Sequence, residues 1–61
     1  MKKLLTINEA AQEFGIGRNK LYRMIKTEPD IPILKLEGIY KVNSTMFSEW
    51  LDKATREKRE L

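Results

Sequence analysis

The sequence predicts a small α+β domain made of two short helices, a β-hairpin and a third helix. Three observations indicate this order. Apolar stripes with helical spacing lie on residues 7–14 and 18–26, and only residues 15–17 separate them. Pro29 and Pro32 then end helical structure. After the prolines, two apolar runs flank a Glu-Gly turn, which is typical of a hairpin.

Residues 7–14 are expected to form the first helix. Thr6 and Glu9 have the spacing of a capping box, in which each side chain binds the main-chain amide of the other residue. An apolar stripe at i, i+3, i+4 and i+7 follows and consists of Ile7, Ala10, Ala11 and Phe14. Gly15 is the expected left-handed residue that ends this helix.

The second helix is expected to run from about residue 18 to residue 26. A glycine-bearing turn of three residues between two short helices is the layout of a helix-turn-helix. Leu21, Met24 and Ile25 form the apolar face of the second helix, and Ile16 in the turn is expected to fill the core between the two helices.

Residues 27–32 are expected to form a loop, and ILKL-EG-IYKV a two-stranded hairpin with Glu37-Gly38 as its turn. Both hairpin faces carry apolar residues. One face would hold Leu34, Leu36 and Ile39, and the other Ile33, Tyr40 and Val42. Which face is buried stays open, because a register change of one residue reverses the two faces.

A third helix is expected to begin at Asn43 or Ser44 and to bury a stripe made of Phe47, Trp50, Leu51 and Ala54. Residues 1–54 would then form one minimal winged helix-turn-helix, with the hairpin as its wing. Residues 55–61 would form a charged tail that extends the third helix as a solvated, frayed end or contacts a partner.

Composition excludes several kinds of function. A chain of 61 residues encloses no deep pocket, and without cysteine or histidine it has no disulfide, thiol or imidazole chemistry. We therefore expect a non-enzymatic protein without cofactor or metal. No apolar run approaches the length of a membrane span, so a cytoplasmic, nucleoid-associated protein is expected. Net charge +3 is compatible with a nucleic-acid partner.

The charges of the second helix are arranged around one face. Asn19, Arg23 and Lys26 lie opposite the apolar stripe, with Tyr22 beside them, and residues 17–27 contain no acid. Arginine and asparagine side chains suit guanine and adenine edges in the major groove. Lys20 on the other flank and the free amides at the helix start suit phosphate. The alternative is an idle, solvated cationic face.

The hairpin carries Lys35 and Lys41, which are candidates for contacts with the DNA backbone or, equally, solvated lysines. Glu37 at the tip would be repelled by phosphate, which argues against insertion of the tip.

The stretch LLTINEAAQEFGIGRNKLYRMI resembles the excisionase-type DNA-binding family, and the resemblance extends over residues 4–51 through YKV and F-x-x-W-L. It implies a recombination directionality factor that binds repeated sites, bends DNA and helps a tyrosine integrase excise a mobile element. The major-groove contacts that the resemblance implies are Arg18, Asn19, Lys20, Tyr22, Arg23 and Lys26. The chain departs from the family at Glu37-Gly38-Ile39, where a glycine with arginines is usual, and at Gly17, where serine is usual.

Two other functions stay open. The same domain type serves small phage-type (AlpA-like) transcriptional regulators, and a protein-interaction adaptor can use the same scaffold without DNA. For an excisionase or a transcriptional regulator, the expected partners are double-stranded DNA and further copies of the chain on adjacent sites. An excisionase would also have an integrase as its partner.

Overall fold

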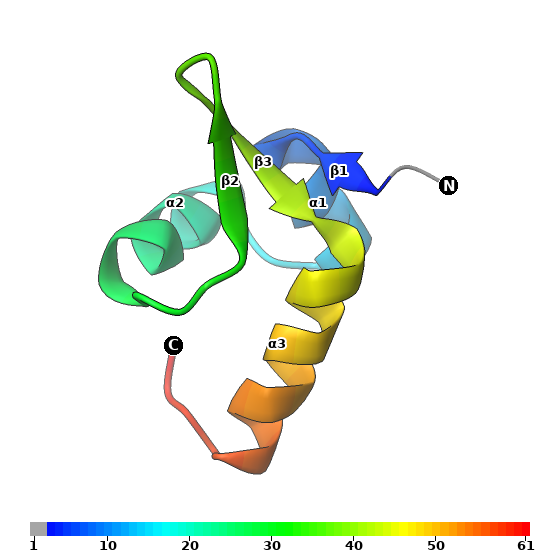
Figure 1. The fold of residues 1–61 in the computed structure, drawn as a ribbon. Coiled ribbons are helices and arrows are strands. Elements are labelled where there is room, and N and C mark those ends of the chain that lie inside the picture. Colours follow the sequence, from blue (N-terminus) through cyan, green and yellow to red (C-terminus); the bar gives the residue numbers. More distant parts are fainter. Residues whose placement is uncertain (1–2) are drawn as a thin grey trace.

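The chain folds as a winged helix-turn-helix, as the sequence predicts (Figure 1). The computed structural model describes residues 3–61, so the first two residues of the expected domain lie outside it. The elements in chain order are β1 (Leu4–Leu5), α1 (Ile7–Phe14), α2 (Arg18–Thr27), β2 (Ile33–Leu36), β3 (Ile39–Asn43) and α3 (Ser44–Arg56). The hairpin of β2 and β3 projects beyond the helices as the wing (Figure 1).

The capping box and the turn between α1 and α2 form as predicted. The Thr6 amide donates to Glu9 Oε1 (2.9 Å), and the Glu9 amide donates to Thr6 Oγ1 (3.1 Å). Gly15 adopts a left-handed conformation with φ 65°, which lets its amide bind the Ala11 carbonyl and end α1. Ile16 then packs against the core, so the turn holds the two helices at a fixed spacing.

The sheet has three antiparallel strands in the order β1-β3-β2, one more than the hairpin that the sequence predicts. The extra strand, β1, is two residues long and pairs Leu4 with Asn43 and Leu5 with Val42. The Ser44 amide extends this pairing by donating to the Lys3 carbonyl (2.8 Å). The N-terminal segment is thereby tied to the strand that leads into α3.

The structure settles which face of the hairpin is buried. Ile33 and Tyr40 pack against the core and Val42 is fully buried, so these three residues face inward. On the other face Leu34, Leu36 and Ile39 are exposed. The turn residues Glu37 and Gly38 both have positive φ (49° and 79°), the requirement of a two-residue hairpin turn whose twist matches the strands.

One hydrophobic core joins the helices to the inner face of the sheet. Its buried members are Leu5, Ile7, Ala10, Leu21, Met24, Val42, Phe47 and Trp50. Phe47 occupies the centre, with its ring 4.9 Å from that of Phe14 in an edge-to-face contact and 5.8 Å from that of Trp50 in a stacked contact. The stripes predicted for the three helices therefore meet at one place.

The third helix continues past residue 54, as expected of the tail, but the end of the tail is not frayed. The α3 helix, capped by the Asn43 side chain, ends at Arg56, beyond the expected domain boundary at residue 54. Lys58 then takes a left-handed conformation (φ 56°), and the chain turns back toward α2 (Figure 1). Arg59 forms ion pairs with the loop after α2, and Leu61 packs against the core. The tail is thus part of the folded domain.

Candidate nucleic-acid interface

The outward face of α2 consists of exposed side chains that hold no other part of the protein. Asn19, Arg23 and Lys26 are exposed, and within residues 3–61 none of the three side chains forms a hydrogen bond or an ion pair. The opposite side of α2 is anchored, because Leu21 is fully buried and Met24 is 3% exposed. One side of α2 is thus buried in the core, and the other side presents free polar groups to solvent.

The α2 helix contains no acidic residue that would weaken the positive potential of this face. The first acid after α2 is Glu28, which lies at the helix end, and its carboxylate is 3.5 Å from the Arg59 guanidinium. The charge of Glu28 is therefore turned toward the tail. The α2 face is left with an uncompensated positive charge, which attracts phosphate.

Two of the predicted DNA contacts are engaged by other elements. Arg18 Nη1 donates to Asn8 Oδ1 of α1 (3.1 Å), at an exposed position beside the start of α2. The Lys20 amine donates to the main-chain oxygen of Leu61. Arg18 and Lys20 therefore lie at the edges of the α2 face, and Lys20 must leave the tail before it can bind a phosphate.

Tyr22 connects α2 to the wing. The Tyr22 ring, whose residue is 41% exposed, contacts the ring of Tyr40 on β3 edge-to-face, with 6.5 Å between the ring centres. Lys35 pairs directly with Tyr40 across the hairpin, and its amine lies 5.4 Å from the Tyr40 ring centre. Tyr40 therefore has both Tyr22 of α2 and Lys35 of β2 as neighbours.

The second predicted wing lysine lies elsewhere. Lys41 pairs with Leu34 in the hairpin register and therefore shares the outer face of the sheet with it. Because α2 packs against the inner face through Tyr40, the structure separates Lys41 from the α2 face. Its contact with DNA stays a prediction.

Tyr40 is the member of this region that the sequence does not reveal as a site residue. Its alternation with Val42 places it on one face of the hairpin, but the contact with Tyr22 depends on how α2 docks on the sheet. No local pattern specifies that docking.

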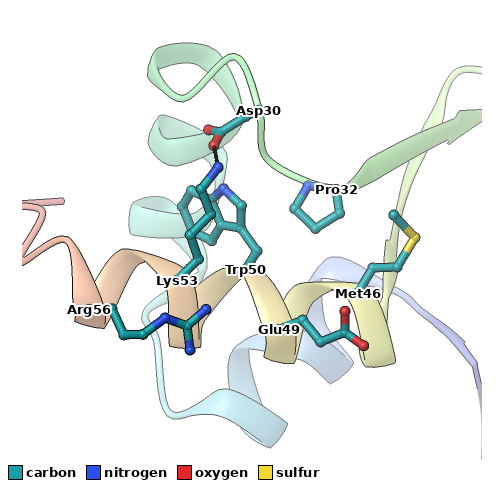
Figure 2. Close-up of a pocket in the computed structure, with 7 residues that line it drawn as sticks. All are labelled: Asp30, Pro32, Met46, Glu49, Trp50, Lys53 and Arg56. Carbon is teal, nitrogen blue, oxygen red and sulfur yellow. Dashed lines mark hydrogen bonds and ion pairs between the residues drawn. The ribbon is translucent and has the colours of Figure 1, made fainter.

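A cluster of charges fixes the end of α2 against α3. Figure 2 shows Asp30 above the Trp50 ring, with Lys53 reaching its carboxylate (3.5 Å). Arg59 also binds Asp30 through both terminal nitrogens, at 2.9 and 3.1 Å, and its guanidinium lies 5.5 Å from the Trp50 ring centre. The loop between α2 and the wing is therefore held from one side, which limits the positions that α2 can take.

The electrostatic effect of this cluster is mutual. The hydrogen bond from Arg59 holds the pKa of Asp30 well below its usual range, although partial desolvation of the carboxyl acts in the opposite direction. Hydrogen bonds to Asp30 and Glu57 raise the pKa of Arg59 above its usual range. Both groups are charged at neutral pH. Within residues 3–61 the buried indole Nε1 of Trp50 has no hydrogen-bond partner.

Residues 3–61 contain neither a candidate metal site nor a candidate membrane-spanning helix. Within this range no group of acidic side chains is arranged to hold a metal ion. Among the helices of the same range, none has the length and the apolar character needed to span a bilayer.

Comparison with protein families shows the family to which the chain belongs. The model of a family described as "Helix-turn-helix domain" matches residues 4–55. The chain belongs to this helix-turn-helix domain family. The match includes α1, α2, the wing and nearly all of α3, so it supports DNA as the partner of the whole winged domain. No curated protein and no solved structure matches the chain.

Proposed function

We propose that this helix-turn-helix domain protein binds specific sites in double-stranded DNA through the outward face of α2 and acts as an excisionase-type factor. The observation that carries the proposal is the free, acid-free face formed by Asn19, Arg23 and Lys26 on a helix whose other side is buried. Family membership supports the DNA partner, and the sequence resemblance supports the excision role.

In this account α2 enters the major groove. Arg23 donates two hydrogen bonds to guanine O6 and N7, and Asn19 pairs with adenine N6 and N7. Lys26, Arg18 and Lys20 bind phosphates along the groove, Tyr22 contacts the backbone beside the wing, and Lys35 of the wing contacts the flanking backbone. The roles divide by chemistry, since planar side chains read base edges and flexible ammonium groups follow phosphates.

The small size of the interface supports binding by several copies together, which suits a role in excision. A single recognition helix with about five to seven phosphate contacts binds weakly at physiological salt. Several copies on adjacent sites, together with a tyrosine integrase, would supply the missing affinity and bend the DNA between the sites. The protein would then be found with the nucleoid and would need no cofactor or catalytic group of its own.

The test is a footprint of the purified protein on both ends of the mobile element whose integrase it would assist. The proposal predicts protected repeats beside the integrase sites, and a rise in excised circles when the protein is added to that integrase. If the protein protected only a promoter, the proposed function would change from excision to transcriptional control. A protein that protects no DNA at low salt would be an interaction adaptor instead.

A further inference from the structure

We propose that Tyr40 is a positioning residue that holds Lys35 against a DNA phosphate beside α2, so that the recognition helix and the inner face of the wing form one continuous binding surface. The inference rests on the proposed DNA-binding function and concerns the junction formed by Tyr22, Tyr40 and Lys35.

The first step is the place of the junction. Lys35 and Tyr40 share the inner face of the hairpin with Ile33 and Val42, but they lie nearer the turn than these two. Val42 is fully buried, whereas Tyr40 is half-buried and Lys35 exposed. The inner face therefore emerges from the core at Tyr40 and Lys35, beside α2.

The second step is continuity with the α2 face. Tyr22 packs on Tyr40, and Lys26 follows Tyr22 by one helical turn on the same side of α2. The aromatic pair thus has a cation on each side, Lys26 on the helix and Lys35 on the wing. A phosphate backbone that passes along α2 would meet both.

The Tyr40 ring holds the Lys35 amine in place without neutralising its charge. The amine lies 5.4 Å from the Tyr40 ring centre and, within residues 3–61, forms no ion pair. A cation over an aromatic face is attracted without being neutralised, so its charge remains available to an anion. A lysine held in this way also loses less conformational freedom when it binds phosphate. Tyr40 is in turn fixed by its edge-to-face contact with Tyr22.

The experiment measures the affinity of the wild-type protein and its variants for a labelled duplex that the wild-type protein has selected from random sequence, at several salt concentrations. Lys35→Gln is expected to weaken binding about three- to tenfold and to reduce the slope of log K against log salt by about 0.9, the value for one phosphate on B-DNA. Tyr40→Leu should have the same two effects, and the double variant should be no worse than either single one. Tyr40→Phe should bind like the wild type, because it keeps the ring.

Lys41→Gln is the matched comparison, since it removes the same charge from the outer face of the same hairpin. The inference requires a smaller change in slope for Lys41→Gln than for Lys35→Gln. Equal salt slopes for Lys41→Gln and Lys35→Gln would overturn the inference, and so would a slope for Lys35→Gln equal to that of the wild type. It would also be overturned if the affinity losses of Tyr40→Leu and Lys35→Gln added up in the double variant. If Tyr40→Leu does not fold, Tyr40→Met, which also removes the ring, takes its place, because Lys35→Gln tests the phosphate contact of Lys35 and not the role of Tyr40. If Arg23→Ala weakened binding and the wing variants did not, the inference about Tyr40 and Lys35 would fail while the proposed DNA binding would stand. If the wild-type protein selected no DNA, both the inference and the proposed function would fail.

Discussion

At the scale of single residues, the molecule divides its polar side chains between two tasks. Thr6, Glu9, Asp30 and Arg59 are engaged in hydrogen bonds or ion pairs that fix chain ends and loops. In contrast, Asn19, Arg23 and Lys26 are free within residues 3–61. Because unengaged polar groups contribute little to folding, substitutions in the two sets should have separable effects on stability and on binding.

Thr6→Ala tests the first set. It removes the acceptor for the Glu9 amide and should lower the free energy of unfolding by about 1 kcal/mol. For a domain of this size, that loss corresponds to a fall in melting temperature of roughly 4–8 °C, measurable by circular dichroism. DNA affinity at a temperature where both proteins are folded should not change. An unaltered melting temperature would mean that the cap does not stabilise α1.

Asp30 gives a prediction in pH. Its pKa is lower in the folded chain than the value of about 3.9 in an unfolded one, so its ionised form stabilises the fold. That contribution is complete above about pH 4 and declines as the pH falls toward the folded pKa. Asp30→Asn should therefore be less stable than the wild type at neutral pH, and the difference should shrink on acidification.

The measurement is denaturant unfolding followed by the fluorescence of Trp50, the one tryptophan of the chain. Glu28 and Glu57 also contact Arg59, and Lys53 also contacts Asp30. Taking the difference between wild type and variant removes the contributions that these groups make equally to both. A difference that stays constant from pH 7 to pH 3 would contradict the assigned role of Asp30.

At the scale of elements, local signals determine most of the fold. The capping box, Gly15 and the apolar stripes specify α1, α2 and α3 to within a residue or two, since caps and helical periodicity are properties of neighbouring residues. Pro29 and Pro32 with the Glu-Gly turn specify the hairpin in the same way. Family comparison confirms the helix-turn-helix but leaves the individual contact residues of α2 as predictions.

What the sequence does not reveal depends on contacts between distant segments. The β1 strand is too short to show a pattern and exists only through pairing with β3. The hairpin faces are both apolar, so only the docking of the helices decides that Tyr40 and Lys35 face α2. From its sequence the tail resembles a solvated helix end. Its turn back toward α2 depends on the left-handed conformation of Lys58 and on the hydrogen bonds of Arg59 with Asp30, a residue distant in the sequence.

The tail supplies the prediction at this scale. Deleting residues 57–61 removes Leu61 from the core surface and Arg59 from Asp30, and it frees Lys20. The partial burial of Leu61 alone is worth about 1 kcal/mol, so the melting temperature should fall by at least roughly 4 °C. Arg56→Ala at the exposed end of α3 is the control and should have little effect. A truncated protein as stable as the full chain would show that the tail is only a solvated end.

At the scale of the whole molecule, the net charge of +3 understates the charge offered to DNA. Of the acids in the loop and tail, Glu28, Asp30 and Glu57 are turned toward Arg59, away from the α2 face. With about five to seven phosphate contacts, log K should fall with log salt with a slope between about −4.5 and −6.3. Anisotropy titrations at several salt concentrations measure this slope, and a value near zero would exclude a phosphate-binding surface.

The central claim is that the outward face of α2 reads DNA, and Arg23→Ala tests it most directly. The measurement is the equilibrium affinity of wild type, Arg23→Ala and Arg56→Ala for a duplex selected by the wild-type protein, with folding of each verified by circular dichroism. Both variants lose one positive charge from an exposed position. We predict that Arg23→Ala loses about 1–3 kcal/mol of binding free energy and relaxes the sequence preference at one base pair, whereas Arg56→Ala loses much less. Equal affinities for the two variants would contradict the claim.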